Sequence, residues 1–320
     1  MPNELLIIDN IYKSFPVKAG LGKTLEAKAV DGVNLIVIRG EAVGLVGESG
    51  CGKSTLGRLA LRLLNPTAGK VTFEGRDLGS LNKQELRDLR KKIQIIFQDP
   101  FASLNPRMRI QEIITEPLVI HGLAMHNEME VRGAALLEKV GLTADALQRY
   151  PHEFSGGQRQ RIGIARALAS GPSFIVADEP VSALDVSVQA QIINLLDDLR
   201  VDLKLSFLFI AHDLNIVRHF SNRVAVMYLG KIMEIAPAEE IYRNPSHPYT
   251  EALLADIPVA DPTVKRKHIF LTDNIPSPTQ IPFGCRFHTR CIYRFEPCDK
   301  IVPRTTDLGN GHFVDCHLRG

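Results

Sequence analysis

Residues 47–55 read Gly47-Glu48-Ser49-Gly50-Cys51-Gly52-Lys53-Ser54-Thr55, which fits the pattern G-x-x-x-x-G-K-S/T. An apolar run over residues 41–47 leads into this stretch and a helical pattern over residues 56–64 follows it. The glycines allow a tight turn whose N–H groups point inward, and the helix N-terminus adds about half a positive charge. The stretch therefore predicts a phosphate-binding loop between a strand and a helix.

Two side chains of this loop have distinct expected roles. Lys53 would reach the β- and γ-phosphates of a bound nucleotide, and Ser54 would offer its hydroxyl to Mg²⁺. The alternative is an ordinary glycine-rich turn with an exposed lysine. The complete motif in its strand-to-helix context favours the nucleotide site, so all nine residues are candidate ATP contacts.

A second candidate element ends an apolar strand further along the chain. The run Phe174-Ile175-Val176-Ala177-Asp178 is followed directly by Glu179. Neighbouring side chains of a strand point in different directions, so one carboxylate can face a metal while the next faces a water molecule. Asp178 fits the Mg²⁺ role and Glu179 the role of general base. A solvated acidic strand end is the alternative, and the phosphate loop upstream argues against it.

Between these elements lies Phe154-Ser155-Gly156-Gly157-Gln158-Arg159-Gln160-Arg161, which resembles the signature motif of ABC ATPases. Phe154 stands where leucine is commoner in that family, an apolar exchange that leaves the glycine-rich turn intact. The resemblance extends to three further elements, each present once and in the family's order. They are the Q-loop glutamine Gln98, the D-loop Ser182-Ala183-Leu184-Asp185 and the switch histidine His212.

The resemblance implies a composite ATP site shared by two chains bound head to tail. Ser155, Gly156 and Gly157 precede a helical run over residues 158–169, so their N–H groups would form a second anion-binding helix terminus. In ABC ATPases this terminus covers the nucleotide of the partner chain. The residues expected to contact the partner's ATP are Ser155, Gly156, Gly157, Gln158 and Asp185.

The remaining site residues also follow from the resemblance. Gln98 would touch Mg²⁺ and water, and His212 would contact the γ-phosphate. A core histidine at a strand end is the alternative for His212. Tyr12 and Phe15 are candidates to stack on adenine, and the family pattern favours Phe15.

The fold expected for the 320 residues is α/β. Continuous apolar runs, typical of parallel strands covered on both faces, lie at residues 93–98, 174–178, 207–211 and 224–229. Helical patterns at residues 110–118, 128–140 and 158–169 predict a helical subdomain over about residues 99–170. The resemblance implies an ABC-type nucleotide-binding domain with a mostly parallel core sheet and an antiparallel β part. We assign it to residues 1–257, followed by a Cys/Pro-rich appendage over residues 258–320.

Composition excludes several other classes of protein. Lys plus Arg minus Asp plus Glu is 38 − 36 = +2, which is no excess of the kind that nucleic-acid binders carry. No apolar stretch approaches the roughly 20 residues that span a bilayer. The start Met1-Pro2-Asn3-Glu4 has no secretory signal, so a cytoplasmic location is expected. A single phosphate loop without heptad repeats argues against soluble, non-transport ABC ATPases.

Two longer stretches narrow the resemblance to one branch of transporters, the ATP-binding subunits of bacterial dipeptide and oligopeptide importers. They are Phe97-Gln98-Asp99-Pro100-Phe101-Ala102-Ser103-Leu104-Asn105-Pro106-Arg107 and Asn244-Pro245-Ser246-His247-Pro248-Tyr249-Thr250. The resemblance implies a peripheral ATPase at the cytoplasmic face of the inner membrane. Its implied partners are a paralogous second ATP-binding subunit, two transmembrane permease subunits and an extracytoplasmic solute-binding protein. Related importers for nickel, oligosaccharides, glutathione or antimicrobial peptides are the alternatives. The stretch after Gln98 would receive a permease helix.

Four of the five cysteines crowd the end of the chain, namely Cys285, Cys291, Cys298 and Cys316. Four thiolates favour an iron–sulfur cluster or Zn²⁺, and no tight C-x₂₋₄-C pair of the kind usual in zinc sites is present. The tail resembles that of some peptide-importer ATPases that bind a 4Fe-4S cluster, so the resemblance implies such a cluster here. Zinc and free or disulfide-forming thiols are the alternatives. The neighbouring cations Arg286, Arg290, Arg294 and Lys300 would offset the cluster's charge.

Three histidines near the tail cysteines, His288, His312 and His317, would be spare ligands, although surface positions suit them better. Cys51 is expected to be a small residue of the phosphate loop.

Overall fold

The structure is a computed structural model that describes residues 3–18, 20, 24–257 and 275–320. Its contacts divide the chain into two compact units. We call the one that contains residues 80–210 the helical unit, and it also includes residues 1–5 and 37–41. The other contains the phosphate loop, and we call it the P-loop unit; it comprises residues 6–36, 42–79 and 211–320.

The helical unit is built on three parallel strands in the order β6-β7-β8. Their bounds are Ile93–Ile96 (β6), Phe174–Asp178 (β7) and Ser206–Ile210 (β8). Every residue of β7 and β8 is buried, as expected for parallel strands covered on both faces. The apolar runs predicted as strands at residues 93–98, 174–178 and 207–211 are therefore confirmed, with ends that shift by one or two residues.

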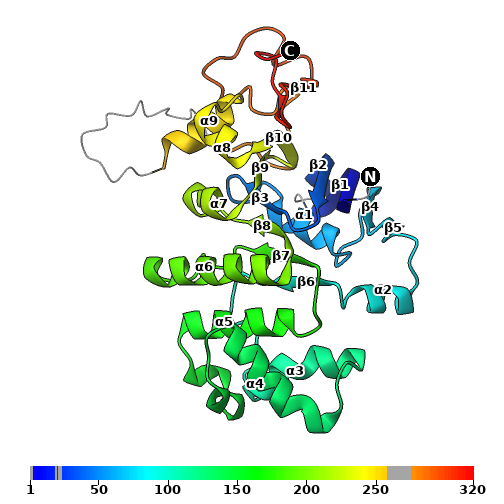
Figure 1. The fold of residues 1–320 in the computed structure, drawn as a ribbon. Helices are drawn as coiled ribbons and strands as arrows, with labels where there is room; N and C mark the ends of the chain where they lie inside the picture. The colour runs from blue at the N-terminus through cyan, green and yellow to red at the C-terminus, as the bar shows by residue number, and fades with distance from the viewer. Residues whose placement is uncertain (1–2, 19, 21–23, 258–274) are drawn as a thin grey trace, which may run out of the picture. The chain divides into compact units, whose positions relative to one another are not determined.

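Three helices of this unit, α3, α4 and α5, pack against one another (Figure 1). They correspond to the helical patterns predicted between residues 110 and 169, and the apolar side chains Ile114, Leu137 and Ile162 are fully buried. This bundle lies within the residues predicted to form a helical subdomain. The helices of the unit are α2 (Lys83–Leu89), α3 (Ile110–His121), α4 (Met129–Lys139), α5 (Gly156–Leu168) and α6 (Val186–Leu203).

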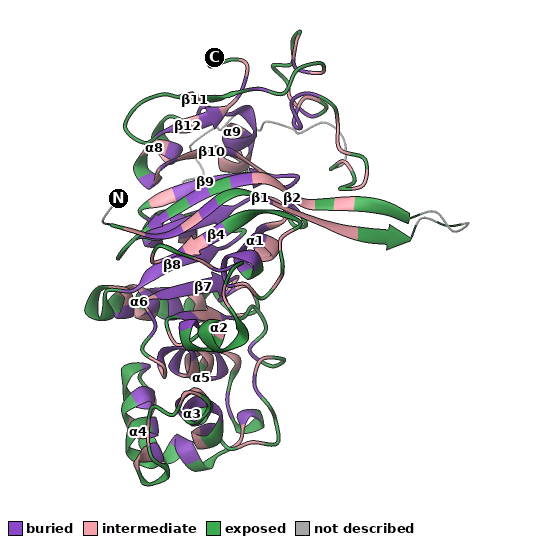
Figure 2. Ribbon diagram, turned by 90° about the vertical axis from the view of Figure 1, so that its right-hand side faces the viewer, coloured by how far each residue is buried: buried purple, intermediate pink, exposed green. Residues whose placement is uncertain are grey.

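An antiparallel sheet in the order β2-β1-β4-β5 lies almost entirely within the P-loop unit. The strands are β1 (Glu4–Lys18), β2 (Thr24–Ile38), β4 (Ala68–Phe73) and β5 (Arg76–Asp77). Side chains alternate along β2, with Val33, Leu35 and Val37 buried and the residues between them exposed. One covered face explains this period of two. The C-terminal end of β1 and the N-terminal end of β2 are exposed (Figure 2).

A mixed sheet forms the centre of the P-loop unit, in the order β11-β12-β10-β9-β3. Its strands are β3 (Ala42–Val46), β9 (Arg223–Tyr228), β10 (Lys231–Pro237), β11 (Thr305–Asp307) and β12 (Phe313–Asp315). Only β3 and β9 are parallel. The helices of this unit are α1 (Lys53–Ala60), α7 (Leu214–Phe220), α8 (Ala238–Arg243) and α9 (Pro248–Ala255).

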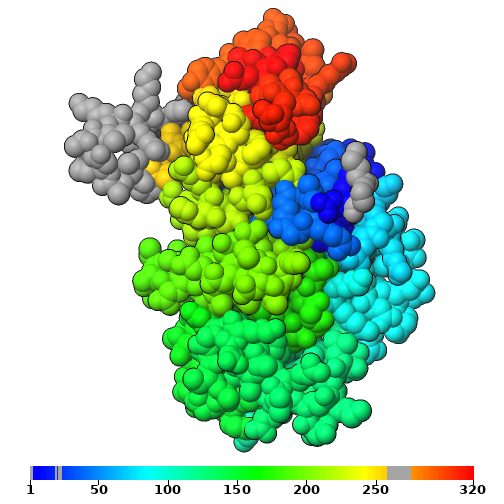
Figure 3. All heavy atoms as spheres, in the orientation of Figure 1, coloured from blue at the N-terminus to red at the C-terminus, as the bar shows by residue number. Residues whose placement is uncertain are grey.

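The described part of the tail packs within the P-loop unit instead of standing apart as a loop-rich appendage. Strand β12 pairs with β10 through Glu234 and Val314, and the tail atoms lie next to those of α8 and α9 (Figure 3). The buried carboxylate of Glu234 accepts hydrogen bonds from the backbone N–H groups of Ser246 and His247, at 2.7 and 3.0 Å, and lies 2.7 Å from Nε2 of His312. A buried carboxylate needs such partners, so this network ties the tail to α9. The predicted boundary at residue 258 falls at the start of the undescribed residues 258–274.

Within the part of the chain that the structure describes, we find no helix with both the length and the apolar character required to span a membrane.

The buried imidazole of His247 generates a test of this packing. Burial lowers the pKa of His247 from 6.5 to about 3, and its Nδ1 accepts the N–H of Tyr249 at the start of α9. The unfolded chain binds a proton below pH 6.5 and the folded chain does not, so stability falls as the pH drops through that value. The loss is about 1.4 kcal/mol per pH unit, or about 2 kcal/mol between pH 6.5 and 5.

His247→Gln should remove this pH-dependent loss, and urea unfolding of both proteins at pH 7, 6 and 5 measures it. The exposed His219→Gln serves as the control and should keep the profile of the unsubstituted chain. Parallel profiles for His247→Gln and the unsubstituted chain would contradict the assignment.

Candidate functional site

The phosphate loop joins β3 to α1, as predicted, and two of its glycines cannot be replaced without a clash. Gly47 has φ 147°, and a Cβ there would lie 2.1 Å from the carbonyl oxygen of Met227 on β9. Gly52 has φ 109°, and its Cβ would lie 2.1 Å from the carbonyl oxygen of Ala29 on β2. The loop therefore sits directly against two strands of its own unit, and only glycine fits at these positions.

Lys53 is the first residue of α1, and its side chain points back into the phosphate loop. Its ammonium donates hydrogen bonds to the carbonyl oxygens of Gly47 at 2.7 Å and Glu48 at 3.0 Å, and the residue is only 4% exposed. The loop is thus curled around a cation at a helix N-terminus, where the partial positive charge favours an anion. Ser54 and Thr55 follow in the first helical turn and are partly exposed.

Cys51 is a packing residue of the loop. Burial raises the pKa of its thiol, and Sγ lies 3.9 Å from the Lys53 ammonium. A buried, protonated thiol is a poor nucleophile. This agrees with the prediction of a small loop residue, while Ser49 and Gly50 are the exposed positions of the loop.

Glu48 is held from two directions by residues that the sequence did not associate with the loop. Its backbone N–H donates to the Tyr249 hydroxyl at 2.9 Å. Its two carboxylate oxygens accept hydrogen bonds from Arg290 at 2.6 and 2.9 Å. The stretch around Tyr249 was noted only for its family resemblance, and Arg290 only as a cation near the cysteines.

The acidic strand end lies in the helical unit. Asp178 is the last residue of β7 and is 4% exposed. Glu179 follows with φ 48°, a left-handed conformation that is strained for a glutamate, and its N–H is bonded to the carbonyl oxygen of Ile210 at 2.9 Å. The side-chain amide of Gln98 donates to Glu179 at 2.8 Å. The structure thus brings together two residues that we expected to act on water, Gln98 as a contact and Glu179 as the general base.

The signature segment begins α5, as predicted. Ser155 is the N-cap, and it exchanges hydrogen bonds with Gln158 in a capping box, which is a purely local pattern. A Cβ on Gly157 would lie 2.4 Å from the side chain of Val188 on α6, so glycine is required for this close approach. Asp185 is the exposed N-cap of α6. The D-loop therefore packs beside the signature glycines within the helical unit.

The P-loop unit contains the two remaining candidates, Phe15 and His212. Phe15 is partly exposed, and the ammonium of Lys13 lies 5.1 Å from its ring centroid. Tyr12 lies against the backbone of Gly32, since a Cβ there would be 3.0 Å from its hydroxyl. His212 is exposed, so it is not a core histidine.

Three of the tail cysteines lie in the irregular segment of residues 275–304, which we call the cysteine loop, and Cys316 directly follows β12. Cys285, Cys298 and Cys316 are buried, Cys291 is partly exposed, and all four are free thiols. The N–H of Cys285 donates to the carbonyl oxygen of Cys298 at 2.8 Å. Burial raises the pKa of Cys285 to about 12 and of Cys291 to about 11, and the neighbouring tail cysteines add to both shifts. In the described ranges, no group of three or more His, Cys, Asp or Glu side chains is arranged to hold a metal ion.

The cations near these cysteines pair with carboxylates, so our expectation that they offset the charge of a cluster is not supported. The pairs are Arg286 with Asp31, Arg290 with Glu48, Arg294 with Asp299 and Lys300 with Glu296. The ring of His288 lies 2.8 Å from the carbonyl oxygen of Cys285, while those of His312 and His317 contact Glu234 and the carbonyl oxygen of Ile301. His312, at 4% exposed, is not the surface residue we expected.

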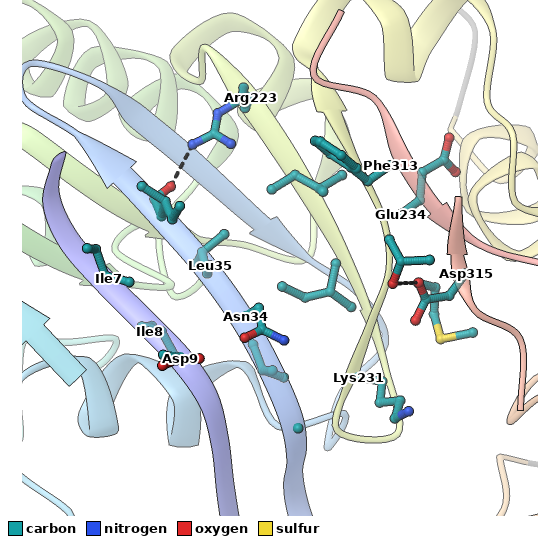
Figure 4. Close-up of a pocket in the computed structure, with 17 residues that line it drawn as sticks. Ile7, Ile8, Asp9, Asn34, Leu35, Arg223, Lys231, Glu234, Phe313 and Asp315 are labelled. Atoms are coloured by element: carbon teal, nitrogen blue, oxygen red, sulfur yellow. Dashed lines mark hydrogen bonds between the residues drawn. The ribbon is translucent and has the colours of Figure 1, made fainter. Parts of the chain in front are cut away.

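A separate cavity of about 430 Å³ lies in the P-loop unit, between β1 and β2 on one side and β10 and β12 on the other (Figure 4). Ile7, Leu35 and Phe313 give it an apolar wall, and Asp9 and Lys231 are among its polar lining residues. None of the predicted ATP-site residues lines this cavity.

Two family models match the chain. The model described as "ABC transporter" matches residues 30–182, and the model described as "Oligopeptide/dipeptide transporter, C-terminal region" matches residues 233–298. "Oligopeptide transport ATP-binding protein AppF" from Bacillus subtilis is 51% identical over 98% of this chain and 97% of its own length. The chain belongs to the ATP-binding subunits of the oligopeptide/dipeptide ABC transporter family. A second relative from this organism, "Putative oligopeptide transport ATP-binding protein YkfD", is 55% identical over 93% of this chain and 91% of its own length.

Solved structures of ABC cassettes share the fold. "Dimeric structure of a post-hydrolysis state of the ATP-binding cassette MJ0796 bound to ADP and Pi" aligns with a TM-score of 0.65 and 31% identity, covering 73% of this chain and 99% of that one. CbiO1 from Clostridium perfringens, described as part of an ABC transporter complex, aligns with a TM-score of 0.65 and 25% identity over 76% of this chain and 92% of that one. The expected ABC-type α/β fold is confirmed.

The glycine contacts of the phosphate loop generate a prediction. Gly52→Ala forces a methyl group onto the backbone of Ala29 at a positive φ, so it should lower the free energy of unfolding by more than about 2 kcal/mol and abolish ATP binding. Gly40→Ala is the matched control, because Gly40 has φ 74° with open space around it, and it should cost about 1 kcal/mol without loss of ATP binding. Denaturant unfolding and nucleotide titration measure both. Equal effects of the two substitutions would refute the steric account.

Proposed function

We propose that this ABC ATPase binds and hydrolyses ATP to energise the import of dipeptides or oligopeptides. The observation that carries the peptide assignment is the match of residues 233–298 to the C-terminal region typical of oligopeptide and dipeptide transporters. This region supplies both Glu234 and Tyr249 to the packing around α9 and the phosphate loop. Importers of nickel, oligosaccharides, glutathione or antimicrobial peptides are the alternatives.

In this proposal the phosphate loop holds the triphosphate of ATP. The N–H groups of residues 47–55 and the Lys53 ammonium surround the phosphates, and Phe15 stacks on adenine. The central position of Lys53 and the partial exposure of Phe15 support these roles. Mg²⁺ would be held by Ser54, Gln98 and Asp178, a hydroxyl, an amide and a carboxylate, which are the hard oxygen donors this ion prefers. When bound, Mg²⁺ neutralises charge on the phosphates.

We assign the role of general base to Glu179. Gln98 and His212 would assist hydrolysis. The carboxylate of Glu179 accepts the Gln98 amide at 2.8 Å and would accept a proton from the attacking water. His212 would contact the γ-phosphate, and its exposure is compatible with that role. The strained φ of Glu179 is a type of feature that clusters at functional sites.

A second ATP-binding subunit, bound head to tail, would complete each site. The N-terminus of α5, with Ser155 as its cap, would cover the γ-phosphate of the partner together with Gly156, Gly157, Gln158 and Asp185. The solved cassette MJ0796 is described as dimeric, which supports this arrangement. We propose that this partner is a paralogous ATP-binding subunit, as in the dipeptide and oligopeptide importers that the sequence resembles.

We propose that the segment after Gln98 docks on a permease subunit. Phe101 is 64% exposed, yet its ring is held by the guanidinium of Arg159, 3.8 Å from the centroid. Arg166 also donates to the carbonyl oxygen of Ser103 at 2.6 Å. An exposed aromatic side chain on a fixed segment suits a protein contact. The chain would then work at the cytoplasmic face of the membrane with two permease subunits and a solute-binding protein.

The four tail cysteines form a second candidate site, for which we propose a 4Fe-4S cluster, with Zn²⁺ as the alternative. The support is that, in addition to burial, the other three cysteines are near enough to Cys285 to raise the pKa of its thiol. Gly284 also lets the Cys285 segment approach Cys298 closely, since a Cβ on Gly284 would lie 2.5 Å from the Cys298 carbonyl oxygen. Thiolates are the ligands of such clusters, which occupy more room than a single zinc ion. When bound, the cluster would cross-link the loop.

Replacing the base tests the hydrolytic assignment. Glu179→Gln should keep ATP affinity, since the amide preserves the shape, while turnover in the assembled transporter should fall at least roughly a hundredfold because the proton acceptor is lost. Light scattering should detect an ATP-bound dimer of ATPase subunits. Glu239→Gln, at an exposed surface ion pair on α8, is the control and should turn over normally. Normal turnover of Glu179→Gln would remove Glu179 from the catalytic role.

Anaerobic purification tests the cluster. The full chain should be brown, absorb near about 400 nm and contain equal amounts of iron and sulfide. Cys298→Ser should lose the colour, whereas Cys51→Ser, outside the loop, should keep it. Colourless protein with one zinc per chain would favour the alternative and refute the cluster.

A further inference from the structure

Arg290, in the cysteine loop, forms a bidentate ion pair with Glu48, in the phosphate loop. The two guanidinium nitrogens lie 2.6 and 2.9 Å from the two carboxylate oxygens, and the residues are 242 positions apart in sequence. The side chain of Arg290 is 6% exposed and that of Glu48 is 22% exposed. A buried, two-pronged pair of this kind is both stronger and more directional than a surface salt bridge.

The ion pair acts on the residue whose backbone holds the catalytic lysine. The carbonyl oxygen of Glu48 accepts the Lys53 ammonium at 3.0 Å and the N–H of Cys51 at 3.3 Å. Its N–H donates to the Tyr249 hydroxyl. Glu48 is therefore fixed through its N–H, its carbonyl group and its carboxylate, and a shift of this residue would move Lys53.

Arg290 is presented to Glu48 from a packed platform. Phe287 is 1% exposed, and its ring centroid lies 5.2 to 5.7 Å from those of Tyr228, His247 and Tyr249. Arg286 donates to the carbonyl oxygen of Leu229 and to Asp31. These contacts hold the residues around Arg290 against β9 and α9, so the position of the guanidinium group is set by the packing of the protein itself.

We propose that Arg290 is a positioning residue of the ATP site: through Glu48 it sets the geometry in which the phosphate loop and Lys53 receive the phosphates. The C-terminal loop of this chain is thus a working part of the nucleotide site. The proposal rests on the ATP-binding function proposed above. The hydrogen bonds to Glu48 also raise the pKa of Arg290, so its guanidinium group stays charged at any physiological pH.

The test compares MgATP binding to the full chain and its variants by isothermal titration calorimetry. Arg290→Gln should weaken binding roughly tenfold, because Glu48 loses its charged partner and the loop its fixed geometry. Arg290→Lys keeps the charge but not the two-pronged geometry, so its affinity for MgATP should lie between that of the unsubstituted chain and that of Arg290→Gln. Arg294→Gln is the matched control: it breaks an exposed ion pair in the same loop, with Asp299 at 3.0 Å, and should bind like the unsubstituted chain.

The stoichiometry of the titration separates positioning from folding. A merely structural role would lower the fraction of competent protein while leaving the Kd of that fraction unchanged, whereas a positioning role raises the Kd at full stoichiometry. A double-mutant cycle with Glu48→Gln adds a second readout: the double variant Glu48→Gln/Arg290→Gln should bind no more weakly than the worse single variant.

Unchanged affinity in Arg290→Gln, or effects of the two substitutions that multiply, would overturn the proposal. Lys53→Ala distinguishes this failure from failure of the ATP-binding function. If Lys53→Ala abolishes binding while Arg290→Gln does not change it, only the role of Arg290 falls. If the unsubstituted chain binds no MgATP, the proposed function itself falls.

Discussion

The phosphate loop, pressed against the backbones of its own unit, is the constraint on which the rest of the P-loop unit depends. A Cβ on Gly47 or Gly52 would lie 2.1 Å from a carbonyl oxygen of β9 or β2, so these strands and the loop are packed at the shortest distance that glycine allows. Tyr249 from α9 and Arg290 from the tail then hold Glu48. Strands β2 and β9, helix α9 and the tail lie apart from the phosphate loop in sequence, yet each contributes a residue that packs against it or bonds to it. The N–H groups of the nine loop residues would surround an anion.

The helical unit also contains a helix that begins at glycines, namely α5. Ser155 caps α5 at the terminus that we propose to bind the partner's nucleotide, and Gly156 allows the D-loop side chain of Leu184 to approach. Glu179, strained and bonded to Gln98, directly follows the central strand β7. Each unit therefore carries one glycine-lined helix start, and the helical unit adds the acidic groups. This division suits the proposed pairing with a second ATP-binding subunit, because in that arrangement the partner would cover the signature helix start.

Sequence patterns predicted the parts of the site that are local. The phosphate loop, the acidic end of β7 and the helix start at the signature motif are each complete within fewer than ten residues, so the first two can be read from spacing and the third from the family resemblance. Contacts between distant residues could not be read in this way. Arg290 and Glu48 are 242 positions apart, and Arg286 and Asp31 are 255 positions apart, so neither ion pair could be read from the spacing of residues along the chain. Likewise, β12 is three residues long and is recognisable as a strand only through its pairing with β10.

The central claim is that ATP bound by this phosphate loop drives the import of peptides, and uptake into vesicles tests it most directly. The chain would be reconstituted with its partner ATPase, both permease subunits and the binding protein, and labelled dipeptides, oligopeptides and nickel would be offered on the side opposite the ATPases. We predict peptide accumulation that requires ATP and disappears when Lys53→Ala is introduced. Accumulation of nickel without peptide, or peptide accumulation that survives Lys53→Ala, would contradict the claim.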